Sequence, residues 1–270
     1  MLSILYWNIN KKDLSANIVR LAASYELDII ILDESNVNPA DLLFLLNEQS
    51  AEYEYVPKLG CERFDIFVKF SKSYISARFE ADRISIQEVH LPRRLTFLLS
   101  IVHLPSKLTN NQASQSYGSV RYANYIRRTE EVLRHKRTVV VGDLNMNPFE
   151  DGVIGTEGFH ATMCRRIASK RGRRVHGEHY DYFYNPMWSL LGDYPDGPPG
   201  THFHRHGEHV ELFWNMYDQV LIRPDLLPNF NNNTLRIATT DGVESLVSSN
   251  GVPLREKLSD HLPIMFSLAV

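Results

Sequence analysis

The sequence predicts an α/β protein in which helices are layered on one mixed sheet or on two packed sheets. Two observations lead to this fold class. Short apolar runs of strand length recur along the chain and are bounded by turn residues. Segments with helical periodicity lie between these runs rather than in one block, as in layered α/β folds. At 270 residues, 43% of them hydrophobic, the chain can bury one large core, so we expect a single domain over residues 1–270.

The first three elements are predicted to be a strand, a helix and a strand. Residues 2–7 form an apolar run, and residues 27–32 form a second run that is continuous enough to be buried on both faces. Between them, residues 15–25 place apolar side chains at helical spacing, with Ser15 as the expected N-cap.

The later elements follow from the same patterns. Strands are expected over residues 64–70, 84–89, 95–102, 138–141, 217–222 and 264–268. A helix is expected over residues 121–135, and its candidate inner-face positions are Tyr122, Tyr125, Ile126 and Val132. We interpret the basic stretch 165–174 and the Gly-, Pro- and His-rich stretch 194–209 as surface loops or insertions.

Charge, cysteine content and hydropathy narrow the class of protein. The net charge of −3 does not indicate an unaided polyanion binder. Cys61 and Cys164 fit no zinc or redox spacing; we expect unpaired buried thiols in a reducing compartment, and the alternative is a disulfide between them. The N-terminal residues do not follow the pattern of a secretory signal, and no apolar run approaches the roughly 20 residues of a membrane helix. We therefore expect a cytoplasmic protein without a membrane partner or an obligate protein partner.

Polar residues that can bind a metal ion or transfer a proton occur near the ends of the predicted strands. They are Asn8, Glu34, His103, Asp143, Asn145, Asp218, Asp260 and His261. Each of them alone has an ordinary structural explanation, such as a turn or a cap. Together they match the hydrolysis of a phosphodiester, which requires an activated water and stabilisation of charge on the phosphoryl oxygens.

The residue types suggest individual roles in such a reaction. Glu34, Asp260 and Asn8 offer the oxygen ligands that suit Mg²⁺ or Mn²⁺. His261 and Asp218 form a candidate pair in which a carboxylate orients an imidazole. Asp143 is a candidate for orienting the attacking water, and the candidate donors to phosphate oxygens are Asn145 and His103.

Six short motifs occur in the order of a known superfamily. They are Trp7-Asn8-Ile9-Asn10, Leu32-Asp33-Glu34, His103-Leu104-Pro105-Ser106, Gly142-Asp143-Leu144-Asn145, Tyr217-Asp218-Gln219-Val220 and Ser259-Asp260-His261. In these motifs the chain resembles the endonuclease/exonuclease/phosphatase superfamily. That superfamily includes deoxyribonucleases, abasic-site endonucleases, inositol-polyphosphate 5-phosphatases and neutral sphingomyelinases.

The resemblance implies a fold and a division of roles. It implies a four-layered α/β sandwich, with two mixed sheets face to face, helices outside and the motif loops at one end. Glu34 would be the main metal carboxylate, with Asn8 and Asp260 nearby. Asp143 would position the water and Asn145 would hold the phosphate; His261, held by Asp218, and His103 would contact the phosphate from two sides. Asp33 stands where many members have Gln, and the formal base is left open between Asp143 and His261.

The substrate is less well determined. The basic stretch and the aromatic residues after it suit a nucleic acid, with Arg171, Arg173 and Arg174 as candidate contacts; the alternative is a solvated helix face beside core aromatics. Thr201 is a further candidate contact. The histidines near it fit an exposed hairpin face, and we do not expect them to bind zinc: His202, His204, His206 and His209. We expect a metal-dependent nuclease of DNA or RNA. The alternatives are an enzyme for an inositol phosphate or sphingomyelin, and an inactive binding protein.

Overall fold

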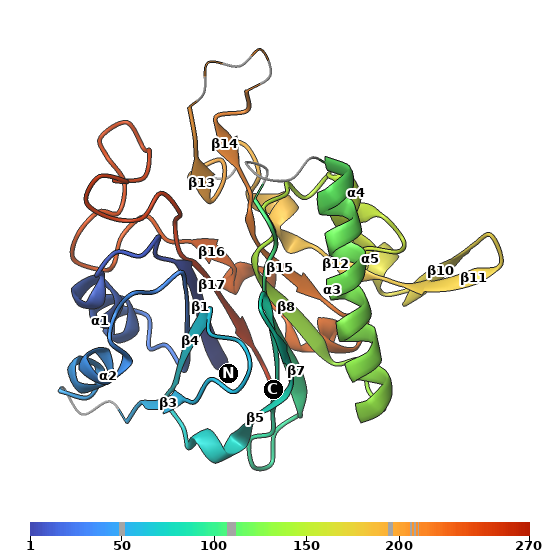
Figure 1. Ribbon diagram of the computed structural model, residues 1–270, viewed down its shortest axis with the longest axis horizontal. Helices are drawn as coiled ribbons and strands as arrows, with labels where there is room; N and C mark the ends of the chain where they lie inside the picture. Colours follow the sequence, from blue (N-terminus) through green and yellow to red (C-terminus); the bar gives the residue numbers. More distant parts are fainter. Residues whose placement is uncertain (49–51, 107–111, 194–196, 206, 208, 210) are drawn as a thin grey trace.

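Two large mixed sheets lie face to face, and helices cover their outer faces (Figure 1). The structure is a computed structural model that describes residues 1–48, 52–106, 112–193, 197–205, 207, 209 and 211–270. This arrangement confirms the α/β class and the four-layered sandwich. The N- and C-termini lie close together at one end of the sheets, opposite the end that carries the site (Figure 1).

In the described part of the chain the first sheet has six strands. In spatial order these are β16 (Arg236–Ile237), β17 (Ile264–Leu268), β1 (Leu2–Asn8), β2 (Ile29–Asp33), β4 (Phe64–Val68) and β3 (Glu54–Val56). Only the pairing of β1 with β2 is parallel among these strands. The outer face of this sheet is covered by α1 (Ser15–Ser24) and α2 (Pro39–Asn47) (Figure 1).

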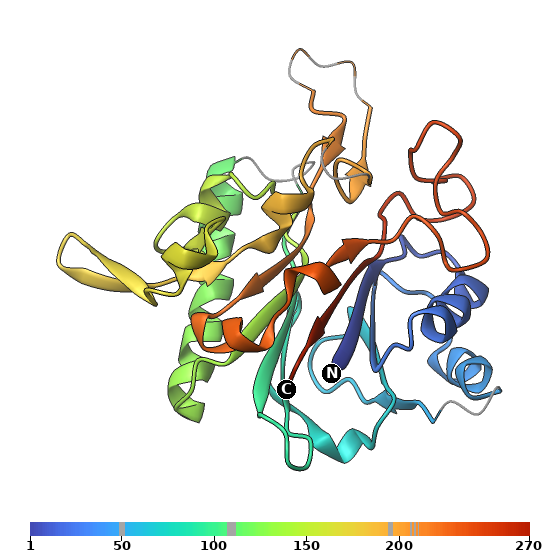
Figure 2. The same ribbon diagram turned by 180° about the vertical axis from the view of Figure 1, so that it is seen from behind.

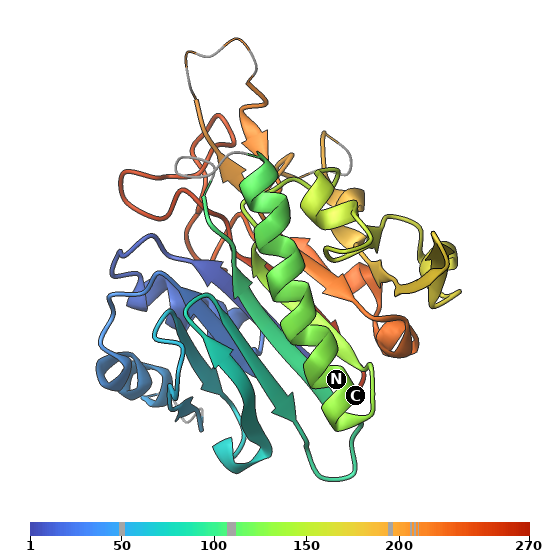
Figure 3. The same ribbon diagram turned by 45° about the vertical axis from the view of Figure 1, so that its right-hand side comes forward.

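The second sheet has seven strands among the described residues. In spatial order these are β5 (Ile75–Ala81), β6 (Ile84–Val89), β7 (Phe97–His103), β8 (Thr138–Asp143), β15 (Asp218–Ile222), β12 (Phe183–Tyr184) and β9 (Ala161–Thr162). The long helix α3 (Gln112–Leu133) lies across its outer face (Figure 3). Shorter helical segments pack around the edges: α4 (Asp151–Ile154), α5 (Arg165–Ala168), η1 (Lys72–Tyr74), η2 (Pro186–Leu190), η3 (Pro224–Asn229) and η4 (Asn232–Thr234).

Two small hairpins extend from the sandwich. β10 (Gly172–Val175) and β11 (Glu178–Asp181) project sideways, whereas β13 (His202–Phe203) and β14 (Trp214–Asn215) lie at the end of the sheets (Figures 1 and 2). The stretch 165–174, interpreted from the sequence as a surface loop or insertion, contains α5 and the first three residues of β10. The stretch 194–209 contains β13; its residues Tyr194 and His206 lie outside the described part of the chain.

Strand periodicity explains how the layers share the core. Successive side chains of a strand point to opposite faces. In β1, Ile4 and Tyr6 belong to the core between the two sheets, whereas Leu5 and Trp7 pack with α1 and α2. A third cluster lies between the second sheet and α3. β1 is thus apolar on both faces, as its continuous apolar run requires.

Three details of the predicted helices are wrong. α3 begins at residue 112 rather than at 121, because the polar, Gly-containing residues 112–120 carry little helical signal. Its Val132 is 79% exposed, since a position six residues after Ile126 lies about 120° around the helix axis from that buried side chain. Ser15 is the first residue of α1 rather than its N-cap; Leu14 is the cap, and the Ser15 amide donates to Asp13 Oδ1.

The cysteines are free, as expected, although only Cys61 is buried and Cys164 is half-buried. No helix in the described ranges has the length and the apolar character that crossing a bilayer requires.

Candidate active site

The site lies at one end of the two sheets because several strands end or begin there with a polar residue. β1 and β2 are parallel, and their last residues, Asn8 and Asp33, are register partners. β7 and β8 are also parallel, and His103 and Asp143 end them side by side. β15 runs antiparallel to β8 and begins with Asp218 opposite Asp143. Because these residues stand at strand ends, the pairing of the strands brings them to one edge of the sheets.

Asp218 and His261 form the expected carboxylate and imidazole pair. Asp218 Oδ2 lies 2.8 Å from His261 Nδ1, and both side chains are buried. The loop before β17 is held by Ser259, whose hydroxyl donates to the Asn8 carbonyl and accepts from the His261 amide. Burial alone would lower the pKa of His261, but the negative charges of Asp218, Asp143 and Asp260 raise it to about 10. The imidazole is therefore protonated at neutral pH, with Nε2 3.9 Å from Asp143 Oδ2.

A second pair of the same kind joins Asp33 and His103. Asp33 Oδ2 lies 2.6 Å from His103 Nδ1 and also accepts from the Tyr6 hydroxyl at 2.6 Å. Burial alone would raise the pKa of Asp33, but His103, Tyr6 and Arg63 hold it below its usual value. Burial alone would lower the pKa of His103, and Asp33 raises it. Asp33 stands where many superfamily members have Gln, and its carboxylate thus has His103 as a charged partner.

Asp143 is held at the centre of the site by three groups. Its Oδ2 accepts from Asn8 Nδ2 at 3.3 Å, and its Oδ1 accepts from the Asn145 amide at 2.8 Å. Its own amide donates to the Tyr6 hydroxyl at 2.9 Å. Burial raises the pKa of Asp143, and neighbouring Asp218 adds to this effect against the opposing charges of His103 and His261.

The backbone around Asp143 depends on close packing of β7 and β8. Gly142 precedes Asp143, and a Cβ added to it would lie 1.8 Å from the carbonyl oxygen of Val102. Asn145 has a φ of 49°, in the left-handed region that Asn tolerates, and its Nδ2 donates to the Leu104 carbonyl at 2.9 Å. The GDLN motif therefore serves the geometry of the strand end as well as the chemistry.

The three expected metal ligands surround one short loop after β1. Asn10 donates its amide to Asn8 Oδ1 at 3.1 Å and its Nδ2 to Asp260 Oδ1 at 2.9 Å. The amide of Lys11 donates to the Glu34 carbonyl at 2.7 Å. Asn10, Lys11 and Glu34 all have positive φ, a strained conformation that recurs at functional sites. Burial alone would raise the pKa of Asp260, but His202 and His261 hold it well below its usual value, so this carboxylate is charged.

The donor set at this edge fits a divalent ion that prefers oxygen. Glu34 and Asp260 side chains are 25% and 30% exposed, so their carboxylates are open to a ligand. Asp218 Oδ1 is buried and has no hydrogen-bond partner among the described residues. Ligand atoms of Asp143, Asp218 and His261 all lie within 4.8 Å of one another. Carboxylate and amide oxygens are the ligands that Mg²⁺ and Mn²⁺ prefer.

Sequence reasoning missed two residues beside the expected ones. Arg63 Nη1 lies 3.6 Å from Glu34 Oε1, 3.8 Å from Asp33 Oδ1 and 3.4 Å from His103 Nδ1. It lines a cavity of about 300 Å³ with Lys11, Glu34, Ser35, Asn36, Glu62 and Asp82. His202 Nε2 lies 3.7 Å from Asp260 Oδ2. Arg63 precedes a predicted strand, which is a weak positional signal, whereas the sequence pattern of His202 is only that of several neighbouring histidines.

The proposed substrate contacts lie in different places. Thr201 is fully buried, and its hydroxyl accepts from the Asp218 amide at 3.1 Å, so it supports the start of β15. Arg171, Arg173 and Arg174 are exposed at the base of and along the β10–β11 hairpin. Arg171 pairs with Asp225 at 2.5 Å, and Arg173 Nε donates to a histidine ring at 3.1 Å.

Among the aromatic residues after the basic stretch and the histidines after Thr201, some side chains belong to the core and one lies beside the site. Phe183 and Tyr184 belong to the core, so they do not form a stacking surface. His202 contacts Asp260 and His261; His206 and Glu208 lie outside the described part of the chain.

Comparisons with known proteins support the fold. The family model described as "Endonuclease/Exonuclease/phosphatase family" matches residues 5–261. Comparison with curated proteins found no match.

Solved structures with this fold cover nearly the whole chain. The structure of D. rerio TDP2 complexed with single strand DNA product is 16% identical with a TM-score of 0.56, over 100% of this chain and 99% of that one. An AP endonuclease from Archaeoglobus fulgidus is 12% identical with a TM-score of 0.55, over 100% of both chains. The human Nocturnin catalytic domain is 14% identical with a TM-score of 0.53, over 99% of this chain and 94% of that one.

Proposed function

The chain belongs to the endonuclease/exonuclease/phosphatase family, and from this premise we propose that it is a divalent-metal-dependent nuclease. Members of this family are phosphoric ester hydrolases. The observation that carries the proposal is the meeting of Asp143 with the Asp218 and His261 pair at one edge of the sheets. Such a set can orient a water and donate to a phosphate oxygen at the same time.

The metal ion would be Mg²⁺ or Mn²⁺, held by Glu34, Asp260 and the side-chain oxygen of Asn8. When bound, an ion of this kind neutralises negative charge on the phosphoryl oxygens. Asn10 is the residue that keeps two of these ligands in place, because it donates to both Asn8 and Asp260.

The protonation states favour a division of labour between Asp143 and His261. Burial raises the pKa of Asp143, which makes this carboxylate a better proton acceptor for the attacking water. His261, with its pKa raised to about 10 by neighbouring carboxylates against the effect of burial, would donate from Nε2 to a phosphate oxygen. Asn145 and His103 would hold the phosphate from the remaining sides. The base is therefore assigned to Asp143.

Two features support a nucleic acid as the substrate. One of the similar structures, that of D. rerio TDP2, contains single strand DNA product, and another is an AP endonuclease. The exposed Arg173 and Arg174 lie on a hairpin that extends from the sandwich, where guanidinium groups can reach a phosphate backbone (Figure 2).

A substrate panel tests this function. The full chain is incubated with single- and double-stranded DNA, RNA, an abasic duplex, inositol phosphates and sphingomyelin, each with Mg²⁺ or with EDTA. His261→Ala serves as the inactive control. We expect turnover of a nucleic acid that EDTA abolishes. Turnover of a small or lipid-linked phosphate without turnover of any nucleic acid would contradict the nuclease assignment, and no turnover at all would favour a binding protein.

The hairpin arginines are tested separately. The triple variant Arg171→Ala, Arg173→Ala and Arg174→Ala should weaken nucleic-acid binding and reduce the slope of log affinity against log salt, because fewer counterions are released. The matched control replaces three exposed arginines with Ala, namely Arg121 and Arg128 of α3 and Arg134 directly after it. Equal slopes in the two triple variants would exclude a specific role for the hairpin.

A further inference from the structure

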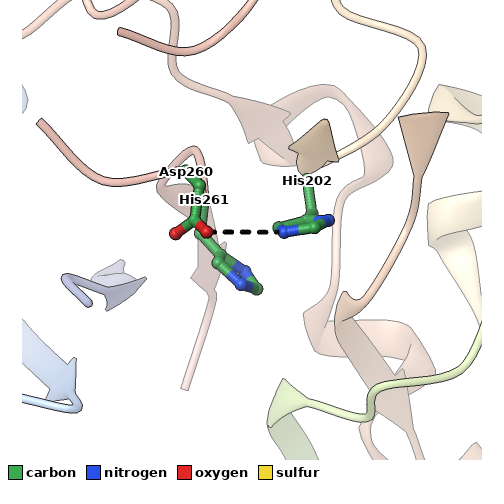
Figure 4. A group of neighbouring side chains, drawn as sticks. All are labelled: His202, Asp260 and His261. Atoms are coloured by element: carbon green, nitrogen blue, oxygen red, sulfur yellow. Dashed lines mark ion pairs between the residues drawn. The ribbon is translucent and has the colours of Figure 1, made fainter. Parts of the chain in front are cut away.

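Two histidine rings lie side by side at the end of the second sheet. The backbones of His202 and His261 form an isolated antiparallel bridge, and the Leu262 amide donates to the Thr201 carbonyl at 2.7 Å. This backbone contact places the two ring centroids 4.5 Å apart. The carboxylate of Asp260 lies beside both rings, with its Oδ2 3.7 Å from His202 Nε2 (Figure 4).

The spacing of these three side chains is close to that of a transition-metal site. One ligand atom from each of His202, Asp260 and His261 lies within 4.8 Å of the other two. Zinc bonds of about 2.0–2.2 Å in a tetrahedron place ligand atoms about 3.3–3.5 Å apart. The 3.7 Å between His202 and Asp260 therefore needs to shorten by only a few tenths of an ångström. Two imidazoles and one carboxylate favour Zn²⁺ over Mg²⁺, which prefers an oxygen shell.

The surroundings of the two rings suit metal ligation. His261 uses Nδ1 for Asp218, which leaves Nε2 as its ligand atom once the metal ion has displaced the Nε2 proton. An imidazole oriented by a carboxylate is the usual arrangement of a metal-bound histidine. His202 is stacked on Tyr217, with ring centroids 5.3 Å apart and an interplanar angle of 25°, so its plane is fixed. Its Nδ1 is buried without a hydrogen-bond partner among the described residues, and its Nε2 faces Asp260.

An ion can reach this position. The side chains of His202 and His261 are 13% and 10% exposed, and that of Asp260 is 30% exposed. Three protein ligands leave a fourth position of a tetrahedral ion for water.

We propose that His202, Asp260 and His261 form a binding site for a nitrogen-preferring transition-metal ion such as Zn²⁺. This site differs from the oxygen-ligand site of Glu34 and Asn8, although both include Asp260. On the proposed function, Zn²⁺ inhibits turnover, because it takes the Nε2 of His261 that would otherwise donate to the phosphate and shares a carboxylate with the Mg²⁺ site. The histidine stretch thus contributes one zinc ligand rather than a zinc cluster of its own.

Zinc binding is measured directly on the metal-free full chain. Calorimetry with ZnCl₂ and the visible absorption of Co²⁺ report the site without any need for turnover. His202→Phe keeps an aromatic ring on Tyr217 but removes the nitrogen, and His202→Gln provides a second variant if the first does not fold. The control His204→Gln with His209→Gln removes neighbouring histidines and leaves the three ligands intact.

The expected result is one zinc ion with a Co²⁺ spectrum of tetrahedral type. Either His202 variant should weaken zinc binding at least about tenfold, and the double control should bind as the wild type does. Wild-type zinc affinity in folded His202→Phe and His202→Gln, or loss of binding in the double control alone, would overturn the site.

Inhibition is measured as the ratio of turnover with and without Zn²⁺ at fixed Mg²⁺ within each variant. We expect this ratio to be well below one in the wild type and to stay near one in His202→Phe. Zinc binding without inhibition in an active wild type would overturn the inhibitory role. A chain without any nuclease activity would refute the proposed function while the calorimetric result still decides the metal site.

Discussion

The contact between Asp218 and His261 makes the strongest prediction about the site. Asp218→Asn keeps the shape of the side chain but removes the charge that lies 2.8 Å from His261 Nδ1. Burial alone would lower the pKa of His261, and Asp218 is the first of the charges that raise it to about 10. An opposite charge at this distance favours the protonated imidazole, so we expect the pKa of His261 in the variant to lie below its value in the wild type.

The loss of activity should therefore depend on pH. Loss of the orienting charge should lower kcat about 10²- to 10⁴-fold at neutral pH, as for other carboxylates that orient a catalytic histidine. The loss should grow as the pH rises toward 10, because the variant imidazole releases its proton at a lower pH than the wild-type imidazole does.

The assay is the pH profile of nucleic-acid cleavage, together with an NMR titration of the imidazole. Asp181→Asn is the matched control. Asp181 is the last residue of β11, and its carboxylate also has a charged partner, since it pairs with Lys136 at 2.6 Å. A folded Asp218→Asn with activity within about threefold of the control would refute the assigned role of this pair.

Three further changes test the metal site, the packing and the charge of the imidazole. Glu34→Gln should raise the Mg²⁺ concentration needed for half-maximal turnover at least about tenfold, and an unchanged Mg²⁺ titration would remove Glu34 from the ligand set. Gly142→Ala should lower the free energy of unfolding by about 2–5 kcal/mol in urea denaturation, because its Cβ would meet the Val102 carbonyl at 1.8 Å; a loss below 1 kcal/mol would contradict this packing argument. His261 has a folded pKa of about 10, above its ordinary value, so its contribution to stability is complete below pH 6.5 and is lost as pH rises toward 10. Melting temperatures of metal-free protein should fall over that range more steeply for the wild type than for His261→Gln.

The sequence predicts the members of the site better than the contacts among them. Asn8, His103 and Asp143 could be placed because each ends an apolar strand, a local pattern that survives folding. The contact between Asp33 and His103 joins residues 70 positions apart and depends on the packing of two sheets, which no local pattern encodes.

The same limit applies to the elements outside the site. The bridge between His202 and His261 arises because β13 lies against the loop before β17, and hairpin periodicity alone suggested only an exposed face. The beginning of α3 was missed because its polar residues gain helical structure by packing rather than by propensity.

Tyr6 shows how the structure couples stability to the site. Its ring belongs to the core between the sheets, and its hydroxyl donates to Asp33 Oδ2 at 2.6 Å and accepts from the Asp143 amide at 2.9 Å. Tyr6→Phe keeps the ring, but the buried Asp33 carboxylate loses one hydrogen-bond donor and the buried Asp143 amide loses its acceptor. An unsatisfied buried amide costs about 1–3 kcal/mol and a lost hydrogen bond to a charged group about 1.5–3 kcal/mol, so we expect the free energy of unfolding to fall by about 2.5–6 kcal/mol.

The same replacement should also reduce kcat, because the Asp143 backbone loses the group that ties it to the first sheet. Tyr55→Phe is the matched control: the Tyr55 hydroxyl donates to Asp65 Oδ1 at 2.8 Å, away from the residues that face the phosphate. Both variants should be less stable in urea denaturation, but only Tyr6→Phe should lose turnover at a temperature where both remain folded. Equal turnover in the two variants would mean that Asp143 is held by Asn8 and Asn145 alone, and that the hydroxyl between the sheets serves the fold without serving the reaction.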